Sequence, residues 1–457
     1  MRKKKCDEVR PICTNCGRNF LPCQWPEFAN QTLRGFQEID VDRRRREIEN
    51  LVVLAPQIQN TLAYLKQQNE REEHQEKFIT TNPNWNLLRD KLDDDMFLKV
   101  FFDTVLTTIT PPQSIAQVAD ITKEGLQYSS TRKIAICLGA AFIHKEYDAD
   151  FSIVDKKYLE AISELVRTMS DPEFDPFHDE LLHSILLLVV CESMVGFGLK
   201  GLQKHFLPAF AIILGRLENE AEHLKENLKF KLFIDSILYH FSSNIFGYPT
   251  ETLLSLVDPF EMEKKLQDIY LDCENQGPWS HHPILGLSAT SFLTSLKASF
   301  LLKFPNYKHN FRESVKLLAY TQETTELSLN YKNEYDVLSR LIDLASSILL
   351  VKIIKPQVEI WDPEIQRYAL KFMEVLTIYK DNILIKLTGN WAVFVTSLCL
   401  VEENQKAFIR QWLTSAVYKS REYMKKVILD TLEEIWEKAL GMEILCDLDV
   451  MENVYFA

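Results

Sequence analysis

Residues 158–172 read YLEAISELVRTMSDP, and this stretch decides the fold class. Its apolar side chains recur at three- and four-residue steps, which places them on one face of an α-helix. Ser170-Asp171-Pro172 ends the pattern, because proline cannot continue a helix. The same spacing returns near the carboxyl end, and the apolar residues of the two stretches are Tyr158, Leu159, Ile162, Leu165, Val166 and Met169, and then Met424, Val427, Ile428, Leu432, Ile435, Trp436 and Leu440.

The helical pattern extends over most of the chain. Sustained strand-type alternation is absent from the sequence after about Pro83, and no repeat of fixed length is evident. Only 13 of the 457 residues are glycine, fewer than sheet-rich folds with many tight turns use. We therefore predict an all-α fold, with a large multi-helix domain over residues 83–457. A small segment, residues 1–25, and a helical linker, residues 26–82, precede it.

Charge is divided unevenly along the chain. The formal net charge is −13, yet residues 1–46 hold 11 basic and 6 acidic side chains, whereas residues 47–457 hold 41 and 59. Proteins that bind nucleic acids usually carry a basic surplus. The acidic total therefore describes the large body and does not argue against DNA binding by the short basic head.

Membrane insertion and secretion are not expected. The basic residues that follow Met1 are not succeeded by an apolar signal region. The longest uncharged apolar stretch, Leu387 to Val401, is shorter than the ~18 residues that a spanning helix needs. We expect an intracellular protein without disulfides, in which the five scattered cysteines are small buried hydrophobic residues. These are Cys137, Cys191, Cys273, Cys399 and Cys446.

Four further cysteines gather in the first 23 residues, at Cys6, Cys13, Cys16 and Cys23. Thiolates two residues apart can hold one metal ion from a tight turn, and zinc takes four such ligands in a tetrahedron. A chance cluster of structural cysteines is the alternative interpretation. The spacing and the basic residues before Cys6 favour a zinc site.

Lys3-Lys4-Lys5-Cys6-Asp7-Glu8-Val9-Arg10-Pro11-Ile12-Cys13-Thr14-Asn15-Cys16, continued to Cys23, resembles the fungal binuclear zinc-cluster DNA-binding domain. That family has six cysteines, and the four present here match its third to sixth. Met1 stands where the family has a variable residue after the second cysteine. We therefore expect that an upstream segment with the first two cysteines has been lost from this sequence; a truncated isoform is the alternative.

The resemblance implies specific ligands and DNA contacts. The intact family domain holds two zinc ions, and with four thiolates we predict that this chain binds at most one, weakly. The family's base-contacting positions, usually in CGG triplets, fall on Arg2 and Lys3. Lys4 and Lys5 are the expected phosphate partners. Without the cysteines, a solvated face or a nuclear-import signal would explain the same basic run.

The linker contains a short heptad pattern formed by Ile48, Leu51, Ala55, Ile58, Leu62 and Leu65. Proline is tolerated only in the first helical turn, so we predict a helix from near Pro56 to about Phe78. This helix either pairs with a second copy or docks on its own domain. The family often dimerises here, which favours a homodimer through Ile58, Leu62 and Leu65.

The body resembles the fungal-specific transcription factor domain, in the subtype called domain 2. The resemblance rests on loose motifs in the expected order, namely residues 179–198, 201–206, 282–287, 391–395 and 432–436. It implies a fungal, nuclear regulator of RNA polymerase II genes. Its partners would be double-stranded DNA and the transcription machinery or coactivators, and the helical body would respond to effectors or proteins. A DNA-independent interaction protein or dominant-negative regulator is the alternative, because the zinc cluster is incomplete.

We do not expect an enzyme. A Gly-rich phosphate loop and a G-x-S-x-G motif are both absent from the sequence. His178 and His183 are five residues apart, so they leave a common helix face and do not form a metalloprotease motif. Glu192 is either a ligand-binding residue or, as we favour, a buried acid with hydrogen-bond partners. The acidic and hydrophobic tail, residues 443–457, is either an activation segment or a terminal element packed on the body.

Overall fold

The structure is a computed structural model. It describes residues 92–110, 114–147, 149–171, 173–175, 177–195, 199–224, 227–250, 253, 258–270, 288–326, 334–415, 422–451, 454 and 456. Within these ranges the chain is helical and forms no β-strand, so the all-α prediction is confirmed. The described part also contains no helix that is both long and apolar enough to cross a membrane.

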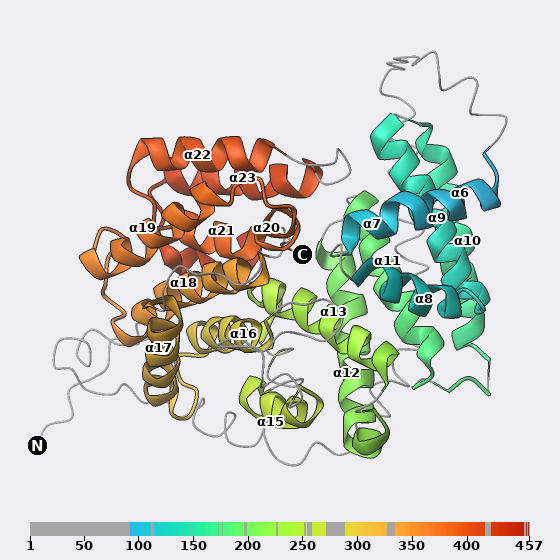
Figure 1. The fold of residues 1–457 in the computed structure, drawn as a ribbon, viewed down its shortest axis with the longest axis horizontal. Coiled ribbons are helices and arrows are strands. Elements are labelled where there is room, and N and C mark those ends of the chain that lie inside the picture. The colour runs from blue at the N-terminus through green and yellow to red at the C-terminus, as the bar shows by residue number, and fades with distance from the viewer. Residues whose placement is uncertain are drawn as a thin grey trace, which may run out of the picture. The chain divides into compact units, whose positions relative to one another are not determined.

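The helices fall into an earlier and a later group (Figure 1). The earlier group consists of α6 (Asp94–Val100), a π-helix (Phe101–Val105), α7 (Leu106–Ile109), α8 (Ile115–Gly125), α9 (Ser129–Tyr147), α10 (Phe151–Met169), α11 (Asp179–Val195), α12 (Leu199–Leu224) and α13 (Leu228–Asn244), followed by a 3-10 turn (Ile245–Gly247). The later group consists of α15 (Pro259–Tyr270), α16 (Ala289–Lys303), α17 (Asn310–Glu326), α18 (Glu334–Ile354), α19 (Pro363–Ile378), α20 (Ile383–Thr388), α21 (Asn390–Ser397), α22 (Glu403–Thr414), α23 (Glu422–Glu437), a 3-10 turn (Met442–Cys446) and α24 (Leu448–Met451).

Helix α10 shows how the sequence sets an element. The Asp150 side chain caps its first turn by accepting a hydrogen bond from the amide of Ser152, and the helix ends at Met169, directly before Ser170. Most of the predicted apolar face is buried or partly buried. Leu159 is the exception, because 37 % of its surface is exposed. It lies at the edge of the stripe, where the neighbouring helices no longer cover it.

Two helices organise the packing. In the earlier group α9 packs against α6, α10 and α11, and in the later group α18 packs against α16, α17, α19 and α21. Gly139 allows α6 to approach α9 closely, since a Cβ atom there would lie 2.0 Å from the carbonyl oxygen of Phe97. Helix α18 is buried around its whole circumference, and its Asp343 carboxylate accepts a hydrogen bond of 2.8 Å from Thr324. Contacts between α13 and α16 join the two groups.

The carboxyl end is packed into the body, which decides between the two alternatives for the tail. Met451, Val454 and Phe456 are each at most 1 % exposed. The amide of Phe456 donates to Asn244 Oδ1 on α13 at 3.0 Å, and Asn390 Nδ2 on α21 donates to the carbonyl of Phe456 at 3.3 Å. Met451, Val454 and Phe456 are therefore part of the core.

Candidate functional site

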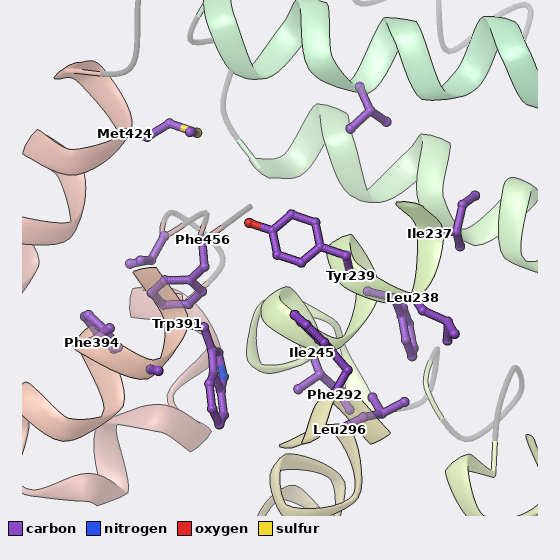
Figure 2. Packing of buried hydrophobic residues seen from close by; sticks show 14 of the residues in the cluster. Ile237, Leu238, Tyr239, Ile245, Phe292, Leu296, Trp391, Phe394, Met424 and Phe456 are labelled. Atoms are coloured by element: carbon purple, nitrogen blue, oxygen red, sulfur yellow. The ribbon is translucent and has the colours of Figure 1, made fainter. Parts of the chain in front are cut away.

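A cavity of about 150 Å³ lies between the earlier and the later helices. Six helices contribute apolar side chains to its wall, among them Leu106 from α7, Val118 from α8, Leu187 from α11, Phe233 from α13, Leu384 from α20 and Met424 from α23. Figure 2 shows the ring of Tyr239 extending from α13 toward the elements that carry Met424 and Phe456. The site therefore depends on segments that are about 300 residues apart in the sequence.

Two helix faces form most of the wall. On α11 the lining residues are His183, Leu186, Leu187, Val190, Ser193 and Met194, and on α13 they are Leu232, Phe233, Ser236, Tyr239 and His240. Both sets follow three- and four-residue steps, so each is one stripe of its helix. The large apolar side chains of each stripe stand beside a serine. The small side chains leave space that the neighbouring helices do not fill.

His183 is a buried polar residue of the wall. The Nδ1 atom of His183 lies 3.0 Å from the carbonyl oxygen of Asp179, and its ring packs edge-on against Phe233. Burial lowers the pKa of His183, so the imidazole is uncharged at neutral pH. The backbone of Ile121 also interacts with the imidazole, although Nε2 of His183 has no hydrogen-bond partner in good geometry. Among the described lining residues there is no Asp, Glu, Lys or Arg.

The charges nearest to His183 pair outside the cavity. Asp179 Oδ1 accepts from Arg216 at 2.5 Å, and its Oδ2 lies 2.8 Å from Lys229 Nζ, which also pairs with Glu124. Burial alone would raise the pKa of Asp179, but the hydrogen bonds from Lys229 and Arg216 outweigh it and lower that pKa. The carboxylate stays ionised and paired, and it is not among the residues that line the cavity.

The position of His183 depends on a glycine in α8. A Cβ atom at Gly125 would lie 2.6 Å from the imidazole ring, which is closer than side-chain atoms approach. Gly125 is buried at the last position of α8. The absence of a side chain there lets the ring of His183, which lines the cavity, pack directly against the end of α8.

A second buried site lies on α11, where Glu192 is only 3 % exposed. Its Oε1 atom accepts a hydrogen bond of 2.6 Å from the hydroxyl of Tyr158 and lies 3.0 Å from Nε2 of His205. Burial raises the pKa of Tyr158, and the neighbouring Glu192 adds to that effect. The prediction of a buried acid with hydrogen-bond partners is confirmed.

We compared the chain with known families, curated proteins and solved structures. The sequence model of the fungal specific transcription factor domain matches residues 89–453, which is most of the chain. The chain belongs to this family. Neither a curated protein nor a solved structure matched it.

The motifs that carried the resemblance of the body lie inside the matched region of this fungal-specific transcription factor domain. The expected all-α architecture and the family are therefore both established for the body. The predicted zinc, DNA and dimer residues lie outside the described residues. They are Cys6, Cys13, Cys16 and Cys23, then Arg2, Lys3, Lys4 and Lys5, and then Ile58, Leu62 and Leu65.

The two histidines that superficially resemble a metalloprotease motif make separate contacts. His178 Nδ1 accepts a hydrogen bond from the amide of Glu180, whereas His183 lines the cavity. Across the described ranges no three His, Cys, Asp or Glu side chains are grouped so that they could hold a metal ion.

Sequence reasoning did not find the cavity of this fungal-specific transcription factor domain. The apolar stripes of α11 and α13 are visible in the sequence, but stripes of this kind also occur in filled cores. The serines within these stripes, Ser193 and Ser236, were the sequence feature that could have indicated a cavity. Only the packing of the six helices shows that the space beside them is empty.

Proposed function

We propose that the protein is a nuclear, sequence-specific regulator of RNA polymerase II transcription, in which residues 1–25 bind DNA and the helical body regulates that activity. The match of the fungal specific transcription factor domain to residues 89–453 carries the proposal. The basic, cysteine-rich segment that precedes this domain supports DNA binding. Membership of a transcription factor family also favours a regulator over an enzyme.

The DNA contacts are assigned by residue type and position. Arg2 and Lys3 contact base edges in CGG-type sites, because Arg and Lys side chains pair with the acceptor atoms of guanine in the major groove. Lys4 and Lys5 contact phosphate, which adds affinity but little sequence preference. Cys6, Cys13, Cys16 and Cys23 hold at most one zinc ion, and Ile58, Leu62 and Leu65 pair two copies.

The test measures binding of the zinc-loaded full chain to a duplex with a CGG site and to a scrambled duplex. Lys3→Ala is expected to weaken binding to the CGG duplex by about 5- to 150-fold, the range for loss of one good base contact. Lys308→Ala removes an exposed lysine of the body and should change nothing. Equal binding of both duplexes by the unchanged protein would refute sequence-specific recognition.

Zinc content and dimerisation have separate measurements. Metal analysis is expected to find no more than one zinc ion per chain, and two would contradict the assignment. Leu62→Asp is expected to convert a dimer into a monomer in light scattering, because a charge in an apolar helix seam is not solvated. A monomeric unchanged protein would remove the dimer from the proposal.

A DNA-independent regulatory role is the second candidate. It is favoured by the family match, which covers the helical body over residues 89–453 and not residues 1–25. In that case the protein acts by binding partner proteins through its helical body or by pairing with an intact factor. A zinc-loaded chain that dimerises but shows no preference for the CGG duplex would favour this function.

A further inference from the structure

Efficient packing of the helices would not leave a cavity of about 150 Å³ in the body. Protein interiors are packed about as densely as organic crystals, and empty volumes of this size are few. Removing packing atoms from a core destabilises it, so a void is a cost to the fold. A helical body with Leu186, Leu187 and Phe233 on the cavity wall could close the space with one larger side chain. Instead Ser193 and Ser236 keep it open.

We infer that this cavity binds a small uncharged molecule, with one aromatic ring or a branched aliphatic chain and at most one hydroxyl group. Size sets the first limit, since a cavity of about 150 Å³ elsewhere stays dry and accepts benzene. The ligand therefore has roughly six to ten non-hydrogen atoms. A larger ring system requires movement of the wall.

Charge sets the second limit. The described lining residues include no Asp, Glu, Lys or Arg, and of the two histidines among them, His183 and His240, burial holds His183 neutral. An ionised ligand would lose its hydration without gaining a partner, which costs far more free energy than burial of apolar surface returns. Carboxylates and ammonium compounds are thus excluded in their charged forms.

Unused hydrogen-bonding capacity sets the third limit. His183 is only 5 % exposed, it lines the cavity, and its Nε2 atom lacks a hydrogen bond. A hydroxyl group suits this atom because it can donate or accept with either tautomer of the imidazole. A single hydroxyl near His183 would therefore add affinity, while most of the other described lining residues are aliphatic or aromatic hydrocarbons and offer a ligand no hydrogen bond.

The walls of the cavity also hold the C-terminal segment. His240 lines the cavity one turn before Asn244, which binds the amide of Phe456. Thr388 lines it two residues before Asn390, which binds the carbonyl of Phe456. Figure 2 shows Phe456 beside Phe394 on the side toward which Tyr239 points. A bound ligand therefore stabilises the arrangement of α13 and α21, the two helices that hold the C-terminal segment.

The regulatory meaning of this site rests on the proposed function, but the binding test does not involve DNA. Toluene, benzyl alcohol and benzoate serve as probes for the full chain, because they share one ring and differ in polarity and charge. Saturation-transfer NMR and the thermal unfolding midpoint report binding. Toluene and benzyl alcohol at millimolar concentration are expected to raise the midpoint by roughly 1–3 °C, and benzoate should not.

Ser236→Leu fills the cavity from α13 and is expected to weaken binding of benzyl alcohol at least tenfold. Ser163→Leu makes the same change at an exposed position of α10 and should leave binding unchanged. If Ser236→Leu does not fold, Ser193→Leu from the α11 side takes its place. Bound benzyl alcohol should also slow carboxypeptidase digestion of the chain end in the unchanged protein.

Three results would overturn the inference. They are the absence of binding by both neutral probes, equal binding of benzoate, and undiminished binding of benzyl alcohol to the cavity-filling variant. An unaltered digestion rate with bound benzyl alcohol would remove the link to the C-terminal segment. Failure of the CGG duplex test, in contrast, would leave every one of these measurements interpretable.

Discussion

Helix α11 borders two different interiors. Along the stripe that faces α9, Ser184 Oγ lies 2.9 Å from Ser130 Oγ, and Cys191 Sγ lies 3.3 Å from Cys137 Sγ. Leu188 lies between these contacts on the same stripe and is 0 % exposed. Along the opposite stripe the side chains border the cavity. One helix therefore has a closed, partly polar side and an open, apolar side.

The difference shows where a core tolerates polar groups and where it tolerates empty space. On the closed side each polar atom needs a partner at hydrogen-bond distance, so the helices must approach closely. On the open side a mostly apolar wall needs few hydrogen-bond partners, so a void costs packing contacts and leaves one polar atom of this stripe, Nε2 of His183, without a partner. An empty space in a folded core is therefore expected to be mostly apolar, as it is here.

Loss of the buried carboxylate should have the largest effect on stability. Glu192→Ala removes the acceptor of the Tyr158 hydroxyl and the partner of His205. We expect the free energy of unfolding to fall by about 3–5 kcal/mol, the range for breaking a buried pair. Urea denaturation measures the loss, with the exposed Glu326→Ala as control. A loss no larger than that of the control would show that the closed side does not depend on this cluster.

Substitutions of two neighbouring leucines, Leu187 and Leu188, allow a direct comparison of the open and the closed side of α11. Leu188→Ala creates a new cavity in a filled region and should lower the free energy of unfolding by about 2–4 kcal/mol. Leu187→Ala extends a cavity that already exists and removes a half-buried side chain, so its loss should be smaller by at least about 1 kcal/mol. Equal losses in urea denaturation would mean that the two sides are packed alike.

Two serine-to-leucine changes make the converse comparison. Ser184→Leu forces a large side chain between α11 and α9 and should destabilise the fold by about 1–3 kcal/mol. Ser236→Leu places the same side chain in existing space, and its effect should be close to zero or stabilising. The midpoints of thermal unfolding measure both. Stronger destabilisation by Ser236→Leu would contradict the cavity.

The smallest expected effect is a dependence on pH. Burial lowers the pKa of His183 below its ordinary value of 6.5, with nearby Lys229 acting in the same direction and Asp179 opposing it. Below pH 6.5 the imidazole of His183 is protonated in the unfolded chain but stays neutral in the folded chain. The contribution of neutral His183 to the free energy of unfolding is therefore complete above pH 6.5 and declines as pH falls below it. Protonation of Asp179 affects stability only at lower pH, because the pKa of this carboxyl group lies below its ordinary value of 3.8.

Denaturation at pH 7.5 and pH 5.5 tests this. His183→Gln should reduce the loss of stability between the two pH values, whereas His178→Gln, on the exposed side of the same region, should not. A similar loss in His183→Gln and in the unchanged protein would show that the folded protein accepts the proton at this position.

Much of the fold was accessible from the sequence. The stripe beginning at Tyr158 predicted α10, the Ser170-Asp171-Pro172 stop predicted its end, and the buried position of Glu192 followed from its apolar neighbours. Local patterns sufficed there because a helix and its buried face depend on neighbours three and four residues away. Leu159 was not predicted correctly, since the exposure of a residue at the edge of a stripe depends on tertiary packing and not on its own helix.

The sequence by itself determined the helical class, the family of the body and the separation of a basic head from an acidic body. Tertiary structure alone decided that the chain end is core and that a cavity lies beside α11 and α13. Composition fits both a free and a packed tail, and the burial of Phe456 with its hydrogen bonds to Asn244 and Asn390 distinguishes them. A cavity is space between distant segments, and its volume depends on how they pack rather than on any one of them.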